Sequence, residues 1–135
     1  MSKRVSYFKP LLLTTTVRNP ERLRKMLLVL KEFDGKILTN EMCEVVEGEF
    51  IRRDLYRPMN GITAEIKEKW FNEDLLSDLE VSALLSANPQ NHKEAGFNRG
   101  WPSRFDTHLK LAKWFGFVYY EIGHSVEFSN LGNMY

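Results

Sequence analysis

The triplet Glu65-Ile66-Lys67, with Asp54 eleven residues before it, has the residue types of a metal-dependent nuclease site. In such a site an Asp and the Glu of the triplet hold Mg²⁺, and the Lys helps to orient the attacking water. That chemistry needs the triplet on a strand, because alternate residues of a strand share one face. Here residues 63–70 predict a helix, in which residues two apart diverge by about 200°. We therefore expect no catalytic residue in this chain.

Other signals for catalysis or metal binding are weak. The three histidines, His92, His108 and His124, have no His or Cys partner at metal-ligand spacing, and Cys43 is the only cysteine. The sequence has no phosphate-binding glycine loop and no nucleophile-elbow motif. We expect neither a metal site nor a cofactor in this chain.

A helix predicted over Ser103–Phe115 carries the residues best suited to nucleic-acid binding. At about 100° per residue, Phe105, Leu109 and Ala112 share one apolar arc. The opposite arc of about 120° is expected to face solvent and carries these residues: Ser103, Asp106, Thr107, Lys110, Lys113 and Trp114. Short hydrogen-bonding groups near the start and lysines further along are typical of a helix that reads the DNA major groove. An ordinary solvent-facing helix would show the same pattern.

Arginines stand near two predicted helix starts. Arg99 and Arg104 flank the start at Ser103, and Arg18 and Arg22 flank the start at Asn19-Pro20. Guanidinium groups bind guanine or phosphate in a bidentate manner. We expect the following residues in or beside the major groove: Ser103, Arg104, Thr107 and Lys110. We expect the following residues at the phosphate backbone: Arg18, Arg22, Arg99 and Lys113.

Four further helices are expected before this one. The first begins at Asn19-Pro20 and ends at Gly35, and the second is capped by Thr39 and ends before Pro58. In the second helix, Met42, Val45, Val46 and Phe50 are expected to face the core. A third helix follows Asn60-Gly61 and carries Ile62, Ile66 and Trp70. A fourth begins at Asn72, with Leu75, Leu79 and Ala83, and also Leu76, as its apolar stripe.

The end of the chain predicts a β-hairpin. Strand-forming residues fill 117–122, Gly123-His124 is a candidate two-residue turn, and residues 126–128 return as a second strand. A helical cluster followed by a helix and a hairpin is the element order of a winged helix. We expect a mainly α fold with a C-terminal winged-helix motif, in a single domain over residues 1–135.

Composition and charge set further limits. The apolar fraction of 43% supports a packed core, no apolar run is long enough to cross a bilayer, and the single cysteine suits a reducing cytoplasm. The net charge is only +1, but residues 3–36 carry a net of +6 and residues 37–90 a net of −6. Such segregation can create a basic surface on a nearly neutral protein.

Both ends of the chain resemble one family. The stretch Leu13–Arg22 (LTTTVRNPER), with Val29–Gly35 and Leu38–Asn40, resembles the start of AlwI-like type IIS restriction endonucleases, which are related to nicking enzymes. Residues 113–118 and 126–132 are similar to the winged-helix end of their first recognition subdomain. The resemblance implies a DNA-recognition fragment of a longer endonuclease. It also implies a C-terminal nuclease domain that uses Mg²⁺, outside this chain. The family's catalytic residues have no counterpart here.

Two other interpretations remain open. A winged-helix protein-interaction domain would use exposed aromatic residues, for which Trp101, Trp114 and Tyr119 are candidates. A complete small transcription regulator would bind a specific duplex without further residues. Under the preferred interpretation the partners are double-stranded DNA and the remainder of the parent endonuclease, with no membrane.

Overall fold

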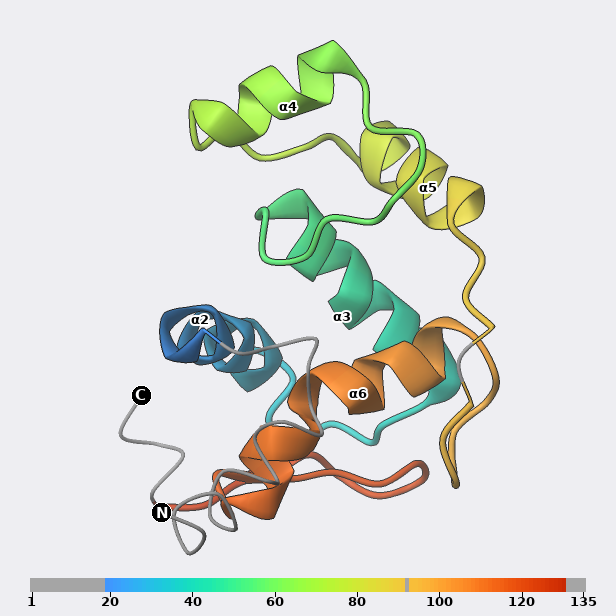
Figure 1. Cartoon of the computed structure of the whole chain (residues 1–135). Helices are drawn as coiled ribbons and strands as arrows, with labels where there is room; N and C mark the ends of the chain where they lie inside the picture. The colour runs from blue at the N-terminus through green and yellow to red at the C-terminus, as the bar shows by residue number, and fades with distance from the viewer. Residues whose placement is uncertain (1–18, 92, 131–135) are drawn as a thin grey trace, which may run out of the picture.

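The computed structural model describes residues 19–91 and 93–130, and this part of the chain is mainly helical (Figure 1). The helices and strands are α2 (Pro20–Lys31), α3 (Asn40–Arg52), α4 (Ala64–Phe71), α5 (Asp78–Ala87), α6 (Trp101–Trp114), β1 (Val118–Tyr119) and β2 (Glu127–Phe128). The expected mainly α fold with a C-terminal hairpin is confirmed at this level. None of these helices is long and apolar enough to span a membrane.

The first two helices begin where their capping residues predicted. The Asn19 side chain accepts a hydrogen bond from the backbone N–H of Glu21 at 2.9 Å, and Pro20 occupies the first turn. The Thr39 hydroxyl accepts from the backbone N–H of Met42 at 3.1 Å. Beyond α2, Gly35 adopts a φ of 83°, a conformation that favours glycine. These signals involve only near neighbours in the chain, so the sequence alone could locate them.

The fourth helix is placed differently from the prediction. Asn72 ends α4, Glu73 takes a positive φ of 59°, and α5 starts only after Ser77. Ser77 and Glu80 form a reciprocal capping box, which sets this later start. The predicted apolar stripe is therefore wrong except for Leu76. Leu75 and Leu79 are 60% and 83% exposed, and Ala83 is exposed too, whereas the buried residues are Leu76, Val81 and Leu84.

The α6 helix starts two residues earlier than predicted. Trp101 and Pro102 form its first turn, and Gly100, with a φ of 110°, precedes it without a side-chain cap. Ser103 is therefore inside the helix and caps nothing. Its hydroxyl donates to the backbone oxygen of Asn98 at 2.7 Å and accepts from the backbone N–H of Glu94 at 3.1 Å. The loop before α6 thus folds back over the first turn.

The core is divided into two apolar clusters. The larger one joins α2, α3, α6 and the hairpin, and its members include Leu27, Leu30, Phe50, Phe105, Leu109 and Tyr120. The smaller one packs α4 and α5 against the end of α3 and the start of α6, through Ile51, Ile66, Trp70, Leu76, Val81, Leu84 and Trp101. Both α3 and α6 contribute to both clusters, and they lie across each other in the middle of the molecule (Figure 1). The α3–α6 contact is therefore the centre of the fold.

A polar pair lies inside this contact. Nδ1 of His108 on α6 is 2.7 Å from Oε2 of Glu47 on α3, and both side chains are fully buried. The His108 ring also contacts the Tyr56 ring, with centroids 4.6 Å apart. Glu47 Oε1 and His108 Nε2 are buried without a hydrogen-bond partner among the described residues. Each member of the pair therefore depends on the other for its polar contact.

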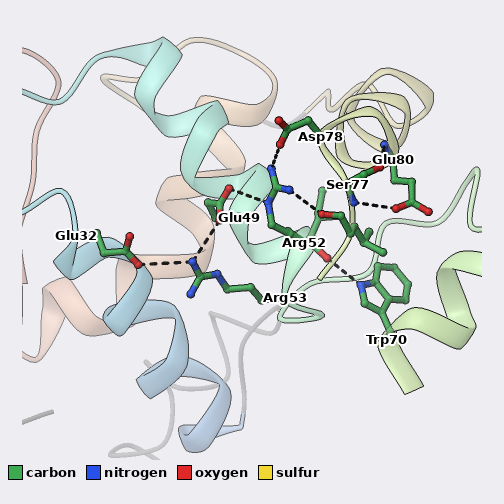
Figure 2. Close-up of polar contacts among 10 residues, drawn as sticks. Glu32, Glu49, Arg52, Arg53, Trp70, Ser77, Asp78 and Glu80 are labelled. Atoms are coloured by element: carbon green, nitrogen blue, oxygen red, sulfur yellow. Dashed lines mark hydrogen bonds and ion pairs between the residues drawn. The ribbon is translucent and has the colours of Figure 1, made fainter. Parts of the chain in front are cut away.

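Side-chain networks connect α3 to its neighbours (Figure 2). Arg52 reaches across to α5, donating to the backbone oxygen of Leu76 at 2.7 Å and pairing with Asp78, and it also bonds Glu49. Arg53 pairs with Glu32 at the end of α2, at 3.7 Å. Because these arginines come from the last turn of α3, they fix this end of the helix to both α2 and α5.

The hairpin is shorter than predicted and gains a third segment. Val118 pairs with Phe128 and Tyr119 with Glu127, antiparallel. The turn bond runs from the N–H of His124 to the oxygen of Glu121, so Ile122-Gly123 is the central pair of the turn, in place of the predicted Gly123-His124. The linker between α2 and α3 forms an antiparallel bridge, from Ile37 to Ser125, with the segment that leads into β2. This linker contact attaches the hairpin to the helices.

We predict that His108→Leu and Glu47→Leu each lower the free energy of unfolding by about 3–5 kcal/mol, because each leaves the partner buried without a polar contact. The double variant should recover most of this loss, since replacing a buried pair by apolar groups is often close to neutral. Urea unfolding of the parent chain, the two single variants and the double variant measures the coupling energy between Glu47 and His108. A loss in the double variant equal to the sum of the two single losses would contradict the prediction.

The exposed pair of Arg24 and Glu21, with a separation of 2.8 Å, provides the control. Removing either side chain of this pair should change the free energy of unfolding by less than about 1 kcal/mol.

Candidate nucleic-acid interface

The solvent-facing side of α6 is the part of the predicted interface that the fold leaves accessible. Arg104, Thr107, Lys110 and Lys113 are half-buried along this side, and Trp114 at the end of the helix is exposed. We call these five residues the α6 arc. Phe105, Leu109 and Ala112 are buried, as the helical periodicity predicted. The opposite side of α6 therefore holds these five side chains in fixed register.

Two residues expected on this arc are buried instead. Ser103 is fully buried beneath the preceding loop, and Asp106 is 6% exposed. Asp106 accepts a hydrogen bond from the Tyr120 hydroxyl at 2.7 Å. Burial, with the nearby carboxylate of Asp106, raises the pKa of Tyr120 well above its usual value, so this hydroxyl remains protonated and donates. The prediction that Ser103 lies in or beside a DNA groove is wrong for this arrangement, because its hydroxyl is already bonded inside the protein.

Lys110 is engaged with acidic neighbours. Its Nζ lies 2.8 Å from Glu94 and 3.7 Å from Asp106. Burial by itself favours the neutral amine, but the hydrogen bond to Glu94 and the charge of Asp106 outweigh it and raise the pKa of Lys110. Lys110 therefore stays charged, but the carboxylates of Glu94 and Asp106 already compensate much of its charge within the protein.

The other cations on α6 are more available. Arg104 donates from Nε to the amide oxygen of Gln90 at 2.9 Å and has no ion-pair partner among the described residues. The Nζ of Lys113 lies over the ring of Tyr120, 4.8 Å from its centroid, and 5.9 Å from that of Tyr119. Thr107 donates its hydroxyl to the backbone oxygen of Ser103 at 3.2 Å, which directs it along the helix.

Of the remaining predicted contacts, Arg99 and Arg22 are exposed. Arg99 lies just before α6 and Arg22 lies in the first turn of α2. Neither takes part in an ion pair within residues 19–91 and 93–130. Arg18 falls outside the described residues. Arg99 therefore precedes the helix that carries Arg104, whereas Arg22 belongs to a separate helix.

A pocket beside Arg22 contains residues that the sequence analysis missed. It has a volume of about 410 Å³ and is lined by Arg22, Asp54, Leu55, Tyr56 and Arg57. Arg57 bonds Asp54 at 2.6 and 2.9 Å and lies over the Trp70 ring. Burial raises the pKa of Tyr56, and the nearby charge of Arg104 offsets part of this rise. In the sequence, the only indication of this pocket was the run Asp54-Leu55-Tyr56-Arg57, which places two charged residues and a tyrosine in the segment between two helices.

The hairpin contributes no cation to this interface. Between Trp114 and Asn130 the chain contains no Lys or Arg, whereas Glu121 and Glu127 are exposed there. Tyr119 donates its hydroxyl to Glu121 at 2.9 Å. A phosphate backbone would meet negative charge at the hairpin.

The residues once considered for catalysis lie apart from this interface. Glu65 and Lys67 are on α4, so the prediction that their triplet is helical is confirmed. Burial raises the pKa of the Cys43 thiol, with a further contribution from Glu47, which keeps the thiol protonated. Within the described ranges, no group of three or more His, Cys, Asp or Glu side chains could hold a metal ion.

Aromatic side chains are exposed at the other end of the α6 arc. Trp114, Phe115 and Tyr119 are each about half exposed, and the Phe115 and Phe117 rings lie 6.0 Å apart. Trp101, which the sequence analysis considered as an exposed aromatic residue, is buried and donates to the backbone oxygen of Leu85 at 3.3 Å.

Comparison with protein-family models, curated proteins and solved structures finds no match to this chain.

Proposed function

We propose that this chain binds duplex DNA through the α6 arc, as the recognition part of a type IIS-like restriction endonuclease. The observation that carries this proposal is the order of the elements along the chain. With α4 and α5 set aside, α2, the bridge at Ile37, α3, α6 and the hairpin support an interpretation as a winged helix, in which helices and strands would come in the order helix, strand, helix, helix, strand, strand. In that arrangement α6 is the helix that enters the major groove.

The proposal treats α4 and α5 as an insertion between the second and third helices of the winged helix. In a simple helix-turn-helix the two helices are joined by a short turn. Here they are joined by residues 53–100, which include α4 and α5. The insertion packs through the smaller apolar cluster on Ile51 of α3 and Trp101 of α6, whereas most of the buried residues of α3 and α6 belong to the larger cluster.

The individual roles follow from the contacts. Arg104 and Thr107 lie nearest the start of α6 and would meet base edges or phosphates, while Lys113 and Arg99 would meet the backbone. Lys110 is balanced by Glu94, and the hairpin lacks cations. We therefore expect weak binding with little sequence preference, with dissociation constants of about 10⁻⁴–10⁻⁶ M at physiological salt.

Two variants with opposite expected effects test the α6 arc. Arg104→Gln should weaken binding and reduce the salt slope by about one unit, because one phosphate contact is lost. Glu94→Gln should strengthen binding, because it removes a negative charge beside the arc and leaves Lys110 with the longer 3.7 Å contact to Asp106. Fluorescence anisotropy with a labelled duplex, titrated at several salt concentrations, measures both effects.

Matched controls lie on α4, away from α6 (Figure 1). Lys67→Gln and Glu68→Gln make the same charge changes at exposed positions. They should shift affinity much less than their α6 counterparts. Equal effects at both sites would mean that net charge, not the α6 arc, governs binding.

The nuclease chemistry is proposed to belong to another part of the parent protein. The family resemblance assigns Mg²⁺ to a separate nuclease domain, and no residue here is assigned to hold it. We predict that this chain does not cleave plasmid DNA with Mg²⁺ or Mn²⁺. Cleavage that disappears in Glu65→Gln would contradict the prediction and return catalysis to the Glu65-Ile66-Lys67 triplet.

A protein-interaction domain is the second candidate, and the exposed Trp114, Phe115 and Tyr119 favour it. Exposed aromatic residues gathered at one place are typical of protein contacts. The salt dependence separates the two functions. Phosphate binding falls steeply with salt, whereas docking through apolar rings changes little. Nanomolar, sequence-specific DNA binding would instead favour a complete transcription regulator.

A further inference from the structure

A groove between α3 and α5, separate from the α6 arc, is open to solvent. It has a volume of about 400 Å³, and we call it the α3/α5 groove. Its lining residues are Glu41, Glu44, Val45, Gly48, Glu49, Arg52, Val81 and Leu85. Val45 is 54% exposed although the sequence predicted it in the core. The groove thus has an apolar floor that this chain does not cover within the described residues.

Gly48 shapes this floor. Its missing side chain allows α5 to approach α3 closely, since a Cβ there would lie 3.1 Å from Val81 Cγ1 and 3.6 Å from Leu85 Cδ1. Glu41, Val45 and Gly48 follow one another at helical spacing along the same side of α3. The groove is therefore a trough along one side of α3, a surface that the side chains of another helix can cover.

The uncompensated charge around the trough is negative. Glu41 and Glu44 are exposed, and neither forms an ion pair with any residue the structure describes. The only cation in the lining, Arg52, is already bonded to Glu49, Asp78 and the backbone oxygen of Leu76 (Figure 2). The trough therefore presents two carboxylates that form no ion pair with the described residues, beside an apolar floor, while the charge of Arg52 is already paired.

We propose that the α3/α5 groove docks an amphipathic, basic helix of a protein partner. Apolar side chains on one face of that helix would cover Val45, Val81 and Leu85. Lysine or arginine side chains at its flank would pair with Glu41 and Glu44. The charge of the groove selects this occupant, because an acidic helix or a nucleic-acid backbone would be repelled there. The site is independent of the α6 arc, so it does not rest on the proposed DNA binding.

The test uses two synthetic peptides, each about four helical turns long. Both carry leucines at helical spacing on one face; one has lysines on the flanks and the other has glutamates. The full chain should bind the lysine peptide saturably and at least about tenfold more tightly than the glutamate peptide, which corresponds to about 1.4 kcal/mol. Fluorescence anisotropy of labelled peptides measures both affinities.

Charge reversal then tests the location. Glu41→Lys with Glu44→Lys should reverse the preference, so that the glutamate peptide binds more tightly. Glu65→Lys with Glu68→Lys makes the same charge change on α4 and should leave the preference unchanged. Val45→Gln should weaken binding of the lysine peptide, but this peptide should still bind more tightly than the glutamate peptide. Circular dichroism verifies that each variant keeps the helical content of the parent chain.

Three results would overturn the proposal. The first is the absence of saturable lysine-peptide binding up to about 1 mM. The second is equal binding of both peptides to the unmodified chain. The third is a change in peptide preference that is as large for the charge reversal on α4 as for the charge reversal in the groove. DNA affinity is measured separately with unlabelled peptide present, so a failure at this groove remains distinct from a failure of the α6 arc.

Discussion

The buried contact between Glu47 and His108 joins α3 to α6 across 61 positions of sequence. Two polar side chains placed inside an apolar cluster are tolerated only when they satisfy each other, because an isolated buried polar or charged group is costly. This requirement restricts how α3 and α6 can slide or rotate against one another. Tyr56 packs on the His108 ring and extends the constraint to the segment after α3. The orientation of α6, and with it the accessible α6 arc, depends on this pair.

The packing of α6 explains why the proposed interface is modest. The helix is enclosed by α2, α3, the hairpin and the preceding loop, and only a narrow strip faces solvent. Asp106 bonds Tyr120, Ser103 bonds the loop, and Lys110 bonds Glu94. A polar side chain that the fold already uses contributes less to a ligand, because binding must first replace its internal bonds. The same contacts give the helix a rigid register, on which the proposed DNA binding would depend.

Charge is divided between two parts of the molecule. Most of the acidic residues lie on the segment that contains α3, α4 and α5, whereas α2 and α6 carry the available arginines. Arg52 and Arg53 are basic residues within the acidic segment, and both are engaged in ion pairs. The α3/α5 groove and the α6 arc consequently differ in sign. Under the two proposals, one small chain would meet a cationic partner and an anionic partner at separate surfaces.

Local signals located much of the helical framework, and tertiary contacts decided which side chains are accessible. Asn19 and Thr39 cap helices through bonds to residues two and three positions away, so their neighbours suffice to locate these starts. The apolar arc of α6 also followed from periodicity. Periodicity cannot reveal a second covering surface, and for this reason Ser103 and Asp106 were expected in solvent but are buried by a loop and by Tyr120. The pairing of Glu47 with His108 and the exposure of Val45 likewise arise where distant segments meet, which no short window of sequence contains.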